Sequence, residues 1–157
     1  MPHVRLQSTA GRLVDLGALG AGRAAIFCYP MTGVPGQPLP QGWDLIPGAR
    51  GCTPQACSFR DAYSDFAAHG VTVYGLSAQS SETQREMAQR LLLPFEVLSD
   101  ADLRFAAALA LPTFEAGGMR LIKRLTLMVR ENTIEHVFYP VFPPNESAAQ
   151  VLAWLAR

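Results

Sequence analysis

The sequence has no excess of charge of either sign, because thirteen basic and thirteen acidic residues give a formal net charge of zero over 157 residues. No basic patch indicates a nucleic-acid partner, and no polybasic or amphipathic segment indicates a membrane surface. The first residues lack the basic stretch and apolar run of a secretory signal. No uncharged run reaches the roughly 18 residues that a membrane span requires. These absences predict a soluble, cytoplasmic protein that binds neither nucleic acid nor membrane.

Cysteine is also scarce, with three residues in the chain. Three cysteines are too few for the disulfide framework of a small secreted protein. Cys28 stands alone in an apolar run, and we expect it to be a small buried strand residue. Cys52 and Cys57 lie close together instead. In a reducing compartment such a pair is typically catalytic or metal-binding rather than structural.

The remaining pattern predicts a single domain, residues 1–157, because the chain is long enough for one core and contains no repeat or low-complexity tract. Predicted strands alternate with predicted helices, which favours an α/β fold with a central mixed β-sheet of about five strands and helices on both faces. We expect a hairpin at 4–16, strands at 24–29, 71–76, 95–98, 121–129 and 133–141, and helices at 53–69, 81–92, 102–109 and 146–156.

A long segment rich in proline and glycine, residues 30–51, connects the first buried strand to Cys52. A connection of this length without regular structure is unusual in a compact domain and is often functional. The helix that follows should begin with Thr53 as its cap and Pro54 in its first position, and it should end at Gly70.

Cys52 is therefore expected at the N-terminus of a helix, where unpaired N–H groups and the helix dipole stabilise a thiolate. Attack of that thiolate on a peroxide would leave a sulfenic acid, and Cys57 is the obvious thiol to condense with it. Five residues of helix separate two side chains by about 140° and about 7.5 Å along the axis. Because a disulfide needs Cα atoms within about 4.4 to 6.8 Å, the helix must unwind locally for the pair to bond.

The segment Cys52-Thr53-x-x-x-Cys57-x-Phe59-Arg60-Asp61 resembles the active-site signature of the peroxiredoxins of the Q type, the bacterioferritin-comigratory branch. Three further segments, in the same order as in that family, are similar to it and extend the resemblance from about residue 24 to the C-terminus. They are Val73-Tyr74-Gly75-Leu76-Ser77, Leu93-Pro94-Phe95-Glu96-Val97-Leu98-Ser99-Asp100 and Arg124-Leu125-Thr126-Leu127-Met128-Val129.

The resemblance implies a thioredoxin-like fold and a thiol-dependent peroxidase that needs no metal or organic cofactor. Cys52 would be the peroxidatic cysteine and Cys57 the resolving one. Arg124 would donate to the peroxide and stabilise the thiolate, a role that suits a permanently charged group with several fixed donors. The substrate would be hydrogen peroxide or an organic hydroperoxide, and thioredoxin or glutaredoxin would reduce the disulfide. Both a monomer and a homodimer remain open.

The chain departs from the family pattern just before Cys52. Ala49 stands where the family has a threonine that binds peroxide, and Leu45 stands where it has a proline. Thr32, Thr53 or a water molecule could supply the missing hydroxyl. An insertion of about residues 33–46 could shape a pocket for bulkier hydroperoxides, with Trp43 either on its wall or packing the loop down. Arg50 and Arg60 are further cations near the cysteines, although such residues are usually solvated.

Three other interpretations remain open at this point. A thiol-disulfide oxidoreductase or redox regulator could share the fold, but such proteins usually have two residues between their cysteines instead of four. A copper-chaperone-like metal binder could use the two cysteines with His136, but that family has three intervening residues and a membrane tether. The replacement of the threonine by Ala49 is also consistent with a catalytically idle homologue.

Overall fold

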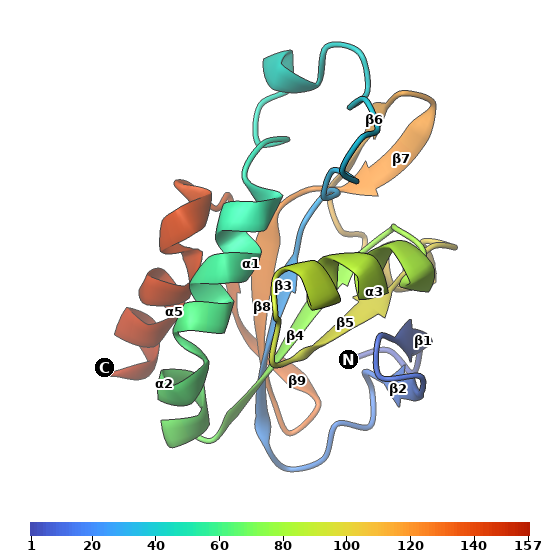
Figure 1. Cartoon of the computed structure of the whole chain (residues 1–157). Coiled ribbons are helices and arrows are strands. Elements are labelled where there is room, and N and C mark those ends of the chain that lie inside the picture. Colours follow the sequence, from blue (N-terminus) through green and yellow to red (C-terminus); the bar gives the residue numbers. More distant parts are fainter.

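A mixed seven-stranded sheet runs through the computed structural model, which describes residues 1–157 (Figure 1). Its spatial order is β2 (Leu13–Asp15), β1 (Arg5–Ser8), β5 (Glu96–Ser99), β4 (Val71–Ser77), β3 (Arg23–Cys28), β8 (Leu125–Arg130) and β9 (Thr133–Phe138). The pairs β3–β4 and β4–β5 are parallel, whereas β1, β8 and β9 each run antiparallel to their neighbours. The prediction of a mixed sheet is confirmed, but with seven strands rather than about five.

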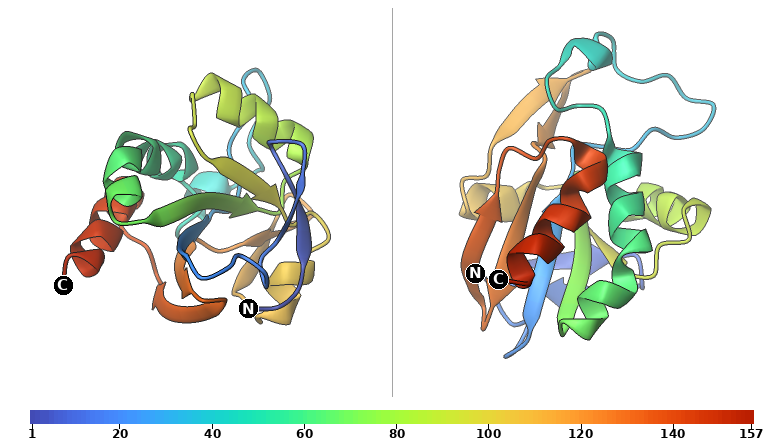
Figure 2. Two further views of the ribbon diagram at one scale, coloured as in Figure 1. Left: turned by 90° about the horizontal axis from the view of Figure 1, so that it is seen from below. Right: turned by 90° about the vertical axis from the view of Figure 1, so that its left-hand side faces the viewer.

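Helices cover both faces of the sheet, as predicted. They are α1 (Cys52–Asp61), α2 (Tyr63–Ala68), α3 (Ser81–Arg90), α4 (Arg104–Ala108) and α5 (Ser147–Leu155). Seen from below, α3 and α4 lie on opposite sides of the sheet (Figure 2). None of the helices is long and apolar enough to cross a membrane.

The central strand β3 divides the core into two layers because its side chains alternate between the two faces. Ala25 and Phe27 pack with residues of α1, α2, α3 and α5, whereas Ile26 and Cys28 pack with α4 and the N-terminal hairpin. Burial on both faces explains why this strand is apolar from Ala24 to Cys28. Cys28 is fully buried, as predicted, and burial raises the pKa of its thiol. Cys28 and Cys52 belong to opposite layers of the core, so Cys28 is not part of the cysteine pair.

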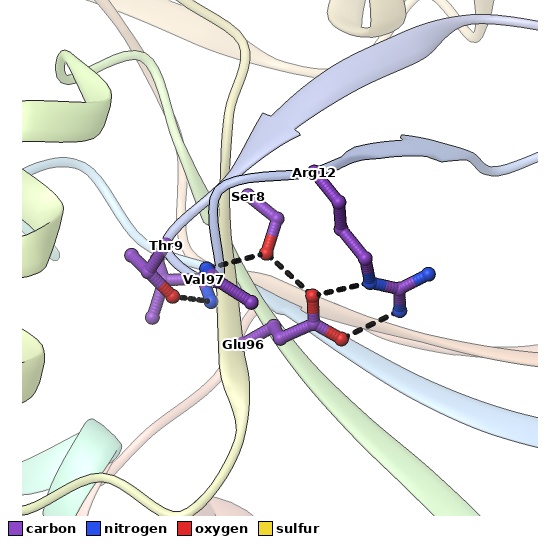
Figure 3. Close-up of polar contacts among 6 residues, drawn as sticks. Ser8, Thr9, Arg12, Glu96 and Val97 are labelled. Atoms are coloured by element: carbon purple, nitrogen blue, oxygen red, sulfur yellow. Dashed lines mark hydrogen bonds and ion pairs between the residues drawn. The ribbon is translucent and has the colours of Figure 1, made fainter.

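The N-terminal hairpin adds two strands to the predicted sheet because it pairs with β5. Ser8 Oγ donates to Glu96 Oε1 at 2.6 Å, and Arg12 donates to both Glu96 oxygens at 2.8 and 2.7 Å (Figure 3). The N–H of Val97 donates to Thr9 Oγ1 at 3.0 Å. The sequence predicted the hairpin correctly, but its alternation could not identify the strand to which the hairpin binds.

The predicted strand 121–129 is wrong, because two separate strands occupy that region. The first, β7 (Met119–Ile122), pairs with β6 (Thr113–Ala116) in a small second sheet, and β8 begins only at Leu125. Lys123 and Arg124 form the break between them. Strands β8 and β9 form a hairpin across Glu131 and Asn132, with both turn residues at positive φ as a two-residue turn requires.

The other segments follow the predictions with shifted ends. The expected helix 53–69 is divided at Ala62 into α1 and α2, and α1 starts at Cys52 with Gly51 as its cap. The predictions that Thr53 caps this helix and that Pro54 opens it are therefore wrong. Residues 30–51 form an irregular connection apart from a short 3-10 helix, η1 (Trp43–Leu45), and a second one, η2 (Pro144–Glu146), precedes α5. Trp43 packs against Phe114 of β6, with ring centroids 6.2 Å apart, so the insertion packs against the small sheet.

The Glu96 contacts give a testable pH dependence. Hydrogen bonding to Arg12 and Ser8 holds the pKa of Glu96 below its usual value despite partial burial. The stability from this pair is therefore present above the unfolded-state pKa and is lost as the pH falls through the folded-state value. We expect Glu96→Gln to lower the free energy of unfolding at pH 7 by only about 0.5 kcal/mol, since water screens the exposed Arg12, and to have a smaller effect at pH 3.

Urea unfolding at the two pH values measures this difference. Glu131→Gln, which removes an exposed carboxyl without an ion-pair partner, is the matched control. A Glu96→Gln deficit that is equally large at pH 3 would contradict the explanation.

Candidate active site

Cys52 is the first residue of α1, and its position depends on the glycine before it. Gly51 has φ +104°, a conformation that residues with a side chain rarely adopt. A Cβ atom on Gly51 would also lie 2.5 Å from Cγ of Pro144 in η2. Glycine therefore allows the chain to turn into α1 while η2 packs closely against the same turn. The prediction that Cys52 lies at a helix N-terminus is confirmed.

Arg124 lies directly against Cys52. Its Nη2 atom is 3.2 Å from Cys52 Sγ, and the residue is only 3% exposed. The same Nη2 approaches the carbonyl oxygens of Gly48 at 3.2 Å, Ala49 at 3.4 Å and Arg50 at 3.0 Å. Arg124 is therefore a buried residue and not a surface charge at the edge of a strand. The break between β7 and β8 turns this side chain inward, toward the loop before Cys52.

The guanidinium of Arg124 has no carboxylate partner. Its Nη1 donates instead to Oε1 of Gln55 at 2.6 Å, and Gln55 is itself fully buried and donates to Ser147 Oγ at 3.4 Å. Buried cations normally need a counter-charge. Since the other acceptors are neutral, a Cys52 thiolate is the anion that this guanidinium can bind.

Sequence reasoning missed Gln55. A signal was available, because Gln55 is three residues after Cys52 and so lies about one turn further along the same helix. The sequence could not show that Gln55 and Arg124, which are 69 residues apart, form a hydrogen bond with each other.

The expected low pKa of Cys52 is not what the structure gives. Burial of the side chain raises the pKa of the thiol above its ordinary value, and this effect outweighs the lowering by Arg124 and by the N–H groups of Met31 and Cys52. The protonated thiol lies 3.7 Å from the carbonyl oxygen of Ala49. In this closed arrangement, formation of the thiolate thus depends on Arg124, because the helix terminus alone does not overcome desolvation.

Cys57 lies on α1 and is half-buried, and both cysteines of the pair are free thiols. The helix runs without interruption from Cys52 to Asp61. The geometry of a regular helix therefore holds between the two cysteines, and they can bond only after the first turns of α1 have unwound.

A pocket of about 250 Å³ opens at Cys52. The insertion supplies part of its wall through Leu39 and Trp43, and Thr53 also lines it. Trp43 thus does both things considered for it, since it lines the pocket and packs the loop down on Phe114. Thr32 lines the pocket too, but its N–H, its hydroxyl and its carbonyl oxygen all form hydrogen bonds with the side chain of Gln79.

The remaining candidates lie apart from this arrangement. Arg50 is exposed and pairs with Asp44, and Arg60 pairs with Asp61. His136 stacks on Trp154, with ring centroids 5.0 Å apart, and no three His, Cys, Asp or Glu side chains are grouped as metal ligands would be. The copper-chaperone interpretation is therefore not favoured.

Arg124→Met tests the electrostatic role of the guanidinium. Removing the positive charge takes away the largest of the effects that oppose burial, so the pKa of Cys52 should rise further above its ordinary value. The pH profile of Cys52 alkylation by iodoacetamide, followed by mass spectrometry, should shift to higher pH accordingly. Arg60→Met removes a half-buried cation near the end of α1, away from Cys52, and should leave the profile unchanged. An unshifted profile in Arg124→Met would show that the contact does not stabilise the thiolate.

Gln55→Glu tests whether neutrality at this position matters. A carboxylate at the place of Oε1 would share the charge of Arg124, so the same alkylation profile should shift upward, by less than in Arg124→Met. Gln150→Glu adds an equal charge on α5 away from Arg124 and is the matched control. If the two glutamate variants behave alike, the neutral amide has no special role.

Comparison with known proteins agrees with this geometry. The profile of the redoxin family matches residues 1–152. Peroxiredoxin Q from the chloroplast of Sedum lineare is 29% identical over 98% of this chain and 74% of its own length. The putative peroxiredoxin bcp of Coxiella burnetii is 31% identical over 64% of this chain and 57% of its own length. The chain thus spans between about half and three quarters of these relatives.

Solved structures show the same fold. Peroxidoxin BcpB of Mycobacterium tuberculosis has a TM-score of 0.78 at 25% identity, covering 98% of this chain and 91% of that one. Peroxiredoxin Q of Xanthomonas campestris has a TM-score of 0.78 at 20% identity, covering 98% and 89%. The predicted thioredoxin-like fold is confirmed. The chain belongs to the redoxin family, and within it to the Q-type peroxiredoxins.

Proposed function

We propose that this chain is a thiol-dependent peroxidase in which Cys52 reduces hydrogen peroxide or an organic hydroperoxide. The observation that carries the proposal is the buried guanidinium of Arg124, which has no carboxylate partner and lies 3.2 Å from Cys52 Sγ. A fixed cation at a buried sulfur stabilises negative charge more strongly than it would in water. Such a group suits both the attacking thiolate and the charge that develops on the leaving oxygen.

In the first step, the Cys52 thiolate attacks one oxygen of the hydroperoxide. The S–O bond forms as the O–O bond breaks, and the other oxygen leaves as hydroxide or alkoxide and takes up a proton. The products are a sulfenic acid on Cys52 and water or an alcohol. Arg124 donates to the region between sulfur and leaving oxygen, where donors contribute most in the transition state.

In the second step, the thiol of Cys57 attacks the sulfenic sulfur, which forms the Cys52–Cys57 disulfide and releases water. This requires the start of α1 to unwind. The contacts of Gln55 with Arg124 and Ser147, and the packing of Gly51 on Pro144, would be lost at that stage. A dithiol reductant such as thioredoxin or glutaredoxin would then return two electrons and two protons to the pair.

Because Ala49 stands where the family has a threonine, another group must supply the hydroxyl that binds peroxide. Gln79 already holds Thr32, so Thr53 or a water molecule is the better candidate. Met31, Leu39 and Trp43 give the pocket an apolar wall, which favours an organic hydroperoxide over hydrogen peroxide.

The setting of the protein is also a proposal. We propose a single domain, residues 1–157, that works in the cytoplasm as a monomer or homodimer. The small number of cysteines and their chemistry as free thiols support a reducing compartment.

Cysteine mapping tests the function directly. Reduced protein is mixed with one equivalent of hydrogen peroxide or cumene hydroperoxide, and its peptides are analysed by mass spectrometry. We expect a Cys52–Cys57 disulfide, a stabilised sulfenic or sulfinic acid on Cys52 in the Cys57→Ser variant, and no peroxide consumption by Cys52→Ser.

Cys28→Ala is the control for a cysteine outside the pair and should behave like the parent. If the parent protein carries sulfinic acid on Cys52 and a free Cys57, the peroxidase activity of Cys52 is supported, but Cys57 is not the resolving residue. Two intact thiols after treatment with both peroxides would refute the proposed function.

A further inference from the structure

We propose that a second pocket, which Arg124 lines, binds an organic carboxylate whose occupancy slows the reaction of Cys52. This pocket has a volume of about 290 Å³. Lys123, Arg124, Phe114, Tyr139 and Phe142 line it, together with Pro47, Gly48, Pro140 and Val141. It shares no residue with the pocket at Cys52. We refer to it as the carboxylate pocket.

The charge of the carboxylate pocket is positive and uncompensated. No aspartate or glutamate lines it, and neither Lys123 nor Arg124 forms an ion pair with a carboxylate. In addition, the Nε atom of Arg124 is buried and has no hydrogen-bond partner. Buried donors are nearly always satisfied, so the guanidinium of Arg124 still lacks one acceptor. Two adjacent cations in a concave, partly apolar wall attract an anion.

The walls indicate which kind of anion fits. Three aromatic side chains, Phe114, Tyr139 and Phe142, surround the cations, and Phe142 is 82% exposed although it is large and apolar. These rings would bury a hydrocarbon body, whereas inorganic phosphate or sulfate would leave them in water. The volume lies at the lower end of the range for small-molecule sites, about 300 to 1,000 Å³. An aromatic acid or a short-chain fatty acid matches this combination of charge, apolar wall and size.

Binding here would act on Cys52 through Arg124. The same guanidinium that lines the carboxylate pocket contacts Cys52 Sγ through its Nη2 atom. A carboxylate held near Arg124 adds a negative charge that disfavours the thiolate. Occupancy should therefore slow every reaction of the Cys52 thiolate, and by linkage the carboxylate should bind more weakly once the thiolate has formed.

Isothermal titration of the reduced protein tests the site without using peroxide, so its outcome is independent of the proposed peroxidase activity. Benzoate and octanoate should bind, and benzyl alcohol and inorganic phosphate should bind much more weakly. Lys123→Ala and Phe142→Ala should each weaken benzoate binding by about fivefold or more, since they remove the exposed cation and an apolar wall. Leu45→Ala is the matched control, because Leu45 is an equally exposed apolar residue that does not line the pocket.

The coupling has its own measurement. Saturating benzoate should slow Cys52 alkylation by about threefold or more at neutral pH, and Phe142→Ala should raise the benzoate concentration needed for half of this effect by about fivefold or more. Absence of benzoate and octanoate binding would overturn the proposal, and so would binding that survives both pocket variants. Phosphate binding as strong as benzoate binding would refute the carboxylate assignment. Binding without any change in alkylation would refute the link to Cys52.

Discussion

The contact between Arg124 and Cys52 is the interaction on which the rest of the site depends. A guanidinium that is 3% exposed requires hydrogen-bond acceptors for its donors, and in Arg124 only Nε lacks one. The chain supplies the carbonyl groups of the loop before Cys52 and the amide oxygen of Gln55. All of these acceptors are neutral, so the positive charge remains available to the sulfur. The glycine at 51, the start of α1 and the break before β8 can each be understood as conditions for this one contact.

Burial and charge act on Cys52 in opposite directions, and this opposition links reactivity to motion. Burial raises the pKa of the thiol, whereas the guanidinium lowers it. A closed site therefore holds the reacting groups in place but gives a thiolate only through Arg124. The same closed helix keeps Cys57 too far along the axis for a disulfide. Turnover in the proposed mechanism must alternate between a folded α1 that reacts with peroxide and an unwound α1 that forms the disulfide.

The sequence predicted the features that depend on local pattern. Strand β3 is apolar from Ala24 to Cys28 because it is covered on both faces, and Cys52 follows the glycine-rich segment that ends at a helix. Features that depend on tertiary contacts were missed. The mostly apolar segment 121–129 gives no sign of the break that turns Arg124 inward. Periodicity does not show where the chain passes from one sheet to another. Gln55 was missed for the same reason, and the raised pKa of Cys52 follows from a degree of burial that no local pattern reports.

The most direct test of the central claim is the second-order rate constant for hydroperoxide reduction by the reduced protein, measured by stopped flow beside free cysteine at the same pH. If a buried, preorganised guanidinium stabilises the charge that develops during attack, cumene hydroperoxide should react with Cys52 about 10³-fold or more faster than with free cysteine. A rate constant no greater than that of free cysteine would contradict the account, because the contact would then hold the sulfur without assisting its chemistry.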